Sequence, residues 1–165
     1  MSWIGGWLGN WLSGWLGRAA EAIAAPDDSG YCAVRVVRYL LAHDAALLAL
    51  VAADNIAAGS LPLDTVLPAI CVQEISLVQR RTASMTAGKV LATSRVQVTV
   101  IATSVSQQKA ILDLVRSACP NTRGIVNTVS VDSILPDQDG PDMRDQDATI
   151  FAQSKDFIVR FALPA

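Results

Sequence analysis

The sequence has few of the residues on which most enzymes and metal sites depend. Its 165 residues include one histidine, His43, so a histidine-rich metal site is excluded and histidine-based catalysis has little basis. The three cysteines, Cys32, Cys71 and Cys119, are far apart and form no Cys-x-x-Cys pair, which fits reduced core thiols in a cytosolic setting. No nucleophile elbow, phosphate-binding glycine loop or His-Glu-x-x-His motif occurs. We therefore expect no enzyme and no cofactor.

An excess of positive charge is also missing. Thirteen lysines and arginines stand against 15 aspartates and glutamates, and this net charge of -2 disfavours general nucleic-acid binding. Hydrophobic residues make up 52% of the chain, which is enough for a folded core. The length predicts one domain with a tail. We expect an arm and linker over residues 1–30 and an α+β domain over residues 31–165.

The arm holds all four tryptophans, in a tandem tetrapeptide over residues 3–18. As a helix it would carry the tryptophans in a slowly drifting stripe with the leucines beside them. Interspersed glycines oppose an isolated helix by about 1 kcal/mol each, so the arm is expected to order only against an apolar surface. It is too short and glycine-rich to span a membrane. Packing on its own subunit, docking on a partner protein and binding to a membrane surface remain open, with membrane binding least favoured. The expected docking residues are Trp3, Trp7, Trp11, Trp15, Leu8, Leu12 and Leu16.

The stretch from Arg95 to Cys119 predicts a strand followed by a helix. The strand's inward face is expected to comprise Val96, Val98, Val100 and Ala102. Ser104 or Ser106 can cap the helix that follows. The apolar stripe of that helix is expected to comprise Ala110, Ile111, Leu114, Val115 and Ala118. Because the link is short, the helix can fold back over the apolar face of its own sheet.

Other segments surround this unit in a simple order. The patterns predict a helix over Tyr31 to Leu41, a short helix over Ala45 to Ala53 capped by Asp44, a loop at residues 61–68, a strand over Ala69 to Val78, a polar turn over Arg80 to Lys89, a strand over Ile125 to Leu135, a polar loop over Pro136 to Asp147 and a strand over Thr149 to Leu163. In the last strand Phe157, Val159 and Phe161 share one face. We expect an α+β fold with a mainly antiparallel four-stranded sheet and helices on one face.

Charge is unevenly distributed along the domain. A basic segment contains Arg80, Arg81, Lys89 and Arg95 without an acid, and an acidic segment contains Asp137, Asp139, Asp142, Asp145 and Asp147. They are either two solvated loops or two complementary patches that join neighbouring subunits head to tail. The acidic loop could instead face a channel, where negative walls repel DNA phosphates. It lacks the ligand spacing of a calcium loop, so no metal is expected there.

A particular order of features carries a family resemblance from about Val34 to Phe161. The chain has Asp44-Ala45-Ala46-Leu47-Leu48-Ala49-Leu50-Val51 ending its early helices, and Gly59 with Leu67-Pro68-Ala69-Ile70 entering a strand. It then has Arg95-Val96-Gln97-Val98-Thr99-Val100 before a helix, and Lys155-Asp156-Phe157-Ile158-Val159-Arg160-Phe161 near its end. This order resembles the tail terminator, or tail completion, proteins of long-tailed bacteriophages. The tryptophan arm lies outside the resemblance.

The resemblance implies a non-catalytic subunit of a hexameric ring. Such a ring would cap the tail tube at its head-proximal end and offer a surface to the head-side connector or head-completion protein. DNA would pass through the ring without specific binding, and assembly would take place in the host cytoplasm. Two alternatives stay open. One is a neck or head-completion protein of the same virion, and the other is a membrane-associated adaptor that uses the tryptophan arm.

Overall fold

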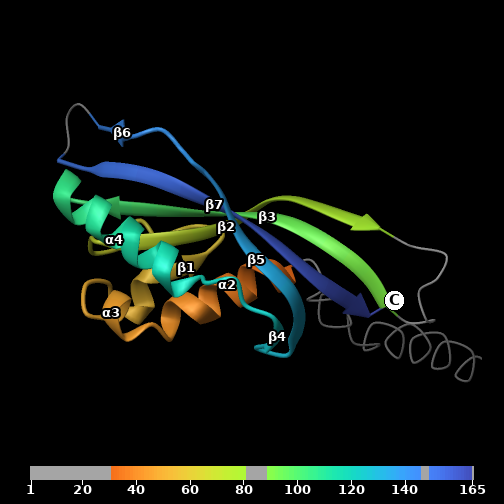
Figure 1. The fold of residues 1–165 in the computed structure, drawn as a ribbon. Coiled ribbons are helices and arrows are strands. Elements are labelled where there is room, and N and C mark those ends of the chain that lie inside the picture. The colour runs from red at the N-terminus through yellow and green to blue at the C-terminus, as the bar shows by residue number, and fades with distance from the viewer. Residues whose placement is uncertain (1–30, 81–88, 146–148, 165) are drawn as a thin grey trace, which may run out of the picture. The chain divides into compact units, whose positions relative to one another are not determined.

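The computed structural model describes residues 31–80, 89–145 and 149–164, which form three α-helices and one mixed sheet (Figure 1). The tryptophan arm, Arg81 and Asp147 lie outside these residues. In chain order the elements are α2 (Cys32–Ala42), α3 (Ala45–Leu48), the 3-10 turn η2 (Ala53–Asn55), β1 (Ile56–Ala58), β2 (Ala69–Arg80), β3 (Lys89–Ala102), α4 (Val105–Ala118), β4 (Gly124–Val126), β5 (Val129–Asp139), β6 (Met143–Arg144) and β7 (Phe151–Pro164).

The sheet is built around the long antiparallel pair of β3 and β7. These strands stay in register from Lys89 opposite Pro164 to Ala102 opposite Phe151. The strand order is β1-β2-β3-β7-β5-β4, and β6 pairs with β7 off this path. Among the strands that the structure describes, only the β1–β2 pair is parallel. The α+β class is therefore confirmed, whereas the predicted four-stranded antiparallel sheet is wrong, because the described residues contain seven strands.

The three strands that the sequence did not predict are too short to be recognised from their own residues. β1, β4 and β6 have two or three residues each, too few to show a period of two in the sequence. The strand expected over Ile125 to Leu135 is two strands, β4 and β5, joined by Asn127 and Thr128 with φ of 43° and 70°. Positive φ at both turn residues is the geometry of a tight type I′ hairpin. The expected loop over Pro136 to Asp147 is also wrong in part, because β5 runs to Asp139 and β6 follows.

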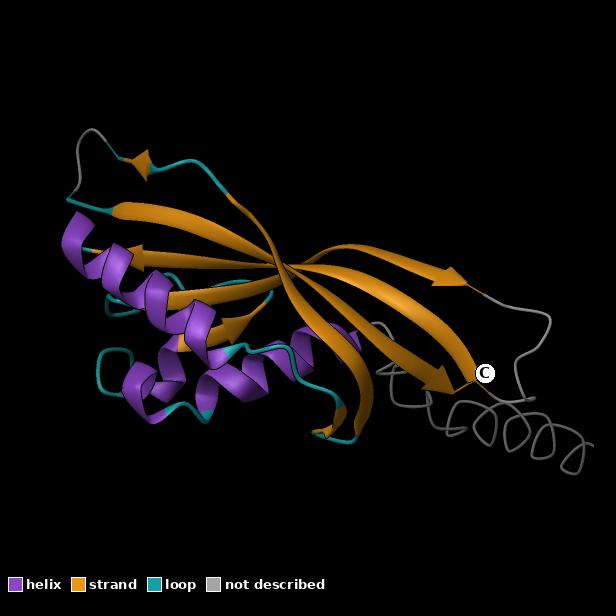
Figure 2. Cartoon of the chain, viewed as in Figure 1, coloured by secondary structure: helices purple, strands orange, loops and turns teal. Residues whose placement is uncertain are grey.

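The helices lie on one side of the sheet, and the other side carries no described helix (Figure 2). The predicted caps are confirmed: Asp44 Oδ1 accepts from Leu47 N at 2.8 Å, and Ser104 Oγ accepts from Gln107 N at 3.2 Å. The helix expected from Ala45 to Ala53 ends already at Leu48. In α4 the expected stripe needs one correction, because Ala110 is exposed and Gln108 is buried instead.

The core lies between the helices and the alternating inward residues of β3 and β7. Val96, Val98 and Val100 of β3 are fully buried, as are Phe157 and Phe161 of β7, which confirms the predicted faces. All three cysteines are buried thiols outside any disulfide, as expected for core thiols. Burial raises the pKa of the Cys119 thiol to about 12, with the Asp44 charge as a second cause. A thiol with such a pKa is a packing residue rather than a nucleophile at neutral pH.

Candidate assembly surface

The predicted basic and acidic segments meet inside one subunit at Asp156. This β7 carboxylate is 3% exposed, and it lies opposite Gln97 in the β3–β7 register. Arg95 donates to Asp156 Oδ2 from Nε at 2.8 Å and forms an ion pair from its terminal nitrogen at 2.7 Å. Gln97 Nε2 donates to the other carboxylate oxygen at 3.2 Å. Because both oxygens have partners, a carboxylate can be buried here without an uncompensated charge.

Arg95 also reaches the acidic segment directly. Its guanidinium lies 3.4 Å from Asp137 Oδ2 across the sheet. Asp137 was expected in a polar loop, but it lies within β5, next to a register shift between Pro136 and Asp139. Pro136 lies opposite Phe157, so the next residue, Asp137, lies on the other face of the sheet, with Arg95. The charge of Arg95 is therefore already paired with two carboxylates of its own subunit.

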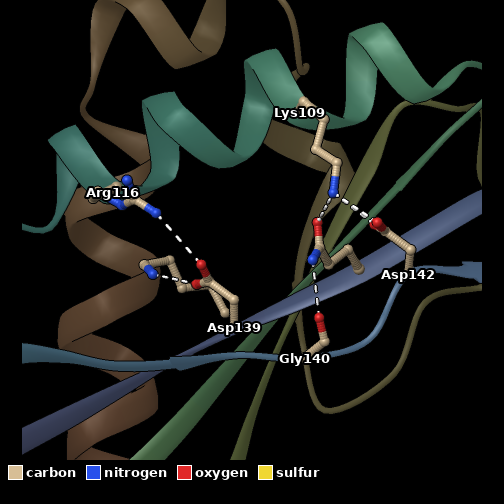
Figure 3. A network of polar contacts seen from close by, with 7 residues as sticks. Lys109, Arg116, Asp139, Gly140 and Asp142 are labelled. Carbon is tan, nitrogen blue, oxygen red and sulfur yellow. Dashed lines mark hydrogen bonds and ion pairs between the residues drawn. The ribbon is translucent and has the colours of Figure 1, made fainter.

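A second polar cluster ties β5 and β7 to helix α4 (Figure 3). Asp139, at the end of β5, forms an ion pair with Lys155 of β7, whose side chain is only 5% exposed. Asp139 also lies 3.5 Å from Arg116 of α4. The hydrogen bond from Lys155 is the main cause that lowers the pKa of Asp139, and the charges of Lys155, Arg116 and Lys109 add to it against an opposing effect of burial.

Lys109 of α4 forms the other half of this cluster. Its ammonium group donates to Asp142 Oδ1 at 2.7 Å and to Gln153 Oε1 at 2.6 Å. Gln153 in turn donates to the backbone carbonyl of Gly140 at 2.9 Å. At Gly140 the chain passes so close to β7 that an added Cβ would lie 2.1 Å from Ser154 Oγ. Glycine therefore permits the close approach that brings Asp139 and Asp142 to the helix.

The structure changes how the predicted charged patches are interpreted. Arg95, Asp137, Asp139 and Asp142 are paired within the subunit, so they hold β5 and the following turn in place. Arg80 ends β2 with an exposed side chain and forms no ion pair with a described residue. Lys89 begins β3, and Asp145 N donates to Ile150 O. Contact of any of these residues with a neighbouring subunit stays a prediction.

An exposed apolar surface lies on the second half of β2. Ile75 and Val78 are each 51% exposed. Leu91 of β3, which lies opposite Arg80 of β2, is 46% exposed. The sequence predicts this strand but not which of its faces the helices cover. One feature of the sequence does indicate an exposed apolar face: apolar residues continue on both faces of the strand, where a half-buried strand would alternate.

The described residues also bear on the other predicted classes of site. No group of three or more histidine, cysteine, aspartate or glutamate side chains is placed to hold a metal among residues 31–80, 89–145 and 149–164. His43 is exposed at the end of α2, where Nδ1 lies 2.8 Å from Tyr39 O and the two rings stack at 4.0 Å. His43 is therefore a surface residue at the C-terminal cap of α2. Within the same residues no helix is long and apolar enough to cross a membrane.

Comparison with known proteins confirms the resemblance seen in the sequence. The family model described as "Tail completion protein gp17" matches residues 35–160. A chain of a solved structure titled "Virion of native gene transfer agent (GTA) particle" is similar in fold, with a TM-score of 0.57 and 18% sequence identity over 77% of this chain and 92% of that chain. No curated protein matches the chain. Because the family model covers most of the sequence, the chain belongs to the tail completion protein gp17 family.

Proposed function

We propose that the protein is a non-catalytic structural subunit that forms a closed ring of six copies at the head-proximal end of a phage tail. The ring would cap the tail tube and join it to the head-side connector or head-completion protein. Assembly would take place in the host cytoplasm before the tail meets the head. Membership of the tail completion family, which gives the protein a structural role in a virion tail, is the observation that carries the proposal.

The structure supports this proposal through the surfaces it leaves available. Four of the nine predicted charged site residues, Arg95, Asp137, Asp139 and Asp142, are paired within the subunit, and an exposed apolar surface on β2 remains for contacts with other chains. A closed ring joins two different surfaces of each subunit. The net charge of -2 is compatible with a channel through which DNA moves without adhering.

The ring is tested with the full-length protein by native mass spectrometry and negative-stain imaging. We expect a closed species of six subunits with a central opening. A strictly monomeric protein at concentrations reached during assembly, together with tails that show no ring, would contradict the proposal. Liposome flotation of the same monomer would then favour the membrane-associated adaptor.

The position in the virion is tested with particles produced without the protein. We expect filled heads and unjoined tails, and joining should be restored when purified protein is added to the tail fraction. Restoration only after addition to the head fraction would favour the neck or head-completion role, because that protein acts on the head side of the joint.

A further inference from the structure

One edge of the sheet is open over most of the length of β2. On that side β1 pairs with Ile70, Cys71 and Val72 only, and Gly59 N adds a last hydrogen bond to Val72 O. From Gln73 to Arg80 no described backbone group bonds to that side of the strand. This open edge is eight residues long, or about 26 Å at 3.3 Å per residue. Unpaired backbone groups in such a row are a template for another strand.

The opposite edge of the sheet is protected, and the contrast is informative. Beyond the residues that β4 covers, β5 contains Pro136, two register shifts and the aspartates 132, 137 and 139. Proline, bulges and charges are the devices that stop an edge from pairing with another strand. The open part of β2 has one register shift, at Ile75, two charged residues, Glu74 and Arg80, and no proline. Glu74 accepts a hydrogen bond from Ser94 Oγ within the subunit, so the β2 edge is the less protected of the two.

Apolar side chains accompany the open edge. Ile75 and Val78 of β2 are half exposed, and so is Leu91 on the neighbouring strand. In strand addition, main-chain hydrogen bonds supply affinity, and the side chains beside the edge select the incoming sequence. The incoming strand should therefore present large apolar residues on one face.

The N-terminal arm has such a pattern when it is considered as an extended strand. Residues four apart lie on the same face of a strand, so Trp3, Trp7, Trp11 and Trp15 would share one face, about 13 Å from one to the next. The intervening residues on that face are Gly5, Gly9 and Ser13, which are small. Eight residues of edge would pair with two tetrapeptides of the arm. Tryptophan is also among the residues that strands favour.

The length of the arm allows it to reach a neighbour. Thirty residues precede Tyr31, and an extended chain of that length can span about 100 Å. The linker of residues 19–30 alone spans up to about 40 Å. Each copy supplies one arm and one open edge, so every donor has an acceptor in a closed ring of any size.

We propose that the arm of one subunit, over residues 3–18, adds as an extended strand to the open edge of β2, from Gln73 to Arg80, in the adjacent copy of the chain. The adjacent copy is chosen because the proposal rests on the ring of the proposed function. The arm would then be an inter-subunit clasp, with its tryptophans placed over Ile75, Val78 and Leu91. Docking back on its own subunit and binding to a lipid surface are the outcomes that would exclude it.

The contact is tested by disulfide cross-linking in the full-length ring. Leu8→Cys is combined with Gln79→Cys on the open edge, or with Gln138→Cys on the protected edge as the matched control. We expect the first pair to give covalent dimers and higher multimers on a non-reducing gel, and the control pair to give few. A cross-link within single chains would show docking on the arm's own subunit and overturn the inference.

A second variant removes the apolar partner without altering the core. Val78→Asp places a charge in the proposed contact and should lower the yield of inter-subunit cross-link by about tenfold, as for a contact weakened by 1.4 kcal/mol. Val105→Asp, at a similarly exposed valine of α4, is the control and should leave the yield unchanged. Equal yields in the two variants would overturn the proposed contact.

Deletion of residues 2–18 separates this inference from the proposed function. We expect a folded domain whose rings dissociate at about tenfold higher concentration than those of the full-length protein. Intact full-length rings that give no arm-to-edge cross-link would overturn the inference and leave the ring standing. A full-length protein that never forms a ring would overturn both.

Discussion

The region around Asp156 and the second half of β2 use their side chains in opposite ways. Around Asp156, charged groups from β3, β5 and β7 are buried or half buried and satisfy one another. Along β2, apolar side chains are exposed, and the backbone has no partner on one side among the described residues. The charged residues around Asp156 pair within the subunit, whereas the second half of β2 leaves apolar side chains exposed.

The largest effect is expected where the charge is most buried. Asp156→Ala would remove the acceptor of Gln97 and the nearer of the two carboxylates beside Arg95, and we expect a loss of about 2–3 kcal/mol in the free energy of unfolding. This is less than the roughly 3–5 kcal/mol typical of a fully buried pair, because the Arg95 side chain is 30% exposed and Asp137 remains beside it. Urea denaturation at fixed protein concentration measures it. Asp132→Ala is the control. It removes an ion pair with Arg123 in which the side chains of Arg123 and Asp132 are 83% and 53% exposed, so it should cost less than about 0.5 kcal/mol. Equal losses would mean that burial does not distinguish the two pairs.

A smaller effect is expected at the close approach of the turn to β7. Gly140→Ala places a methyl group against Ser154 Oγ, and we expect a loss of about 1–2 kcal/mol. Adding Ser154→Ala removes the clashing hydroxyl, so the double variant should be more stable than the sum of the two single changes predicts. Strict additivity in denaturation experiments would show that the two groups do not meet.

The positive charge at the end of β2 should affect assembly rather than folding. Reversing Arg80 and Arg81 to glutamate is expected to weaken the ring by about 1 kcal/mol while leaving the unfolding curve of the domain nearly unchanged. High salt should have the same effect on the unmodified ring, because exposed charges are screened beyond about 8–10 Å. Native mass spectrometry across a salt series checks both. A ring mass that responds to neither change would leave the basic segment as a solvated surface.

The smallest expected effect is the pH dependence of the cluster at α4. The pKa of Asp139 is lowered in the folded state, so its contribution to stability is complete above its unfolded value of 3.8 and is lost as the pH falls through the lower folded value. The melting temperature of the unmodified protein should therefore decrease more steeply below about pH 4 than that of Asp139→Asn. Identical slopes would exclude a role for this carboxylate in acid stability.

Lys109→Ala tests the neighbouring exposed pair and should cost less than about 1 kcal/mol.

Long periodic segments were predictable from the sequence, and contacts between distant segments were not. Strands β2, β3 and β7, helix α4 and the caps at Asp44 and Ser104 each have a local signal. The short strands β1, β4 and β6 exist because a neighbouring strand offers its edge, and nothing within two or three residues records that. Likewise, the pairing of Arg95 with Asp156 depends on a register set across 61 positions of the chain.

For the exposed apolar surface on β2, the sequence could not show which face of the strand the helices cover. Ile75 and Val78 appear equivalent to core residues in the sequence, and only the placement of the helices shows that they are exposed. Conversely, Asp137 and Asp139 appear to be loop residues after Pro136, but they continue a strand through a register shift. Charge patterning identified residues that pair within the subunit, and their predicted contacts with neighbouring subunits stay a prediction.

The most direct test of the proposed function is the position of the protein in the intact particle. Cryo-electron microscopy of tails, with the subunit fitted into the map, should show one ring between the last layer of the tail tube and the head-side connector. It should also show six domains around a channel that DNA can pass. Density for the protein at the distal tip, along the whole tube or nowhere in the tail would contradict the proposal.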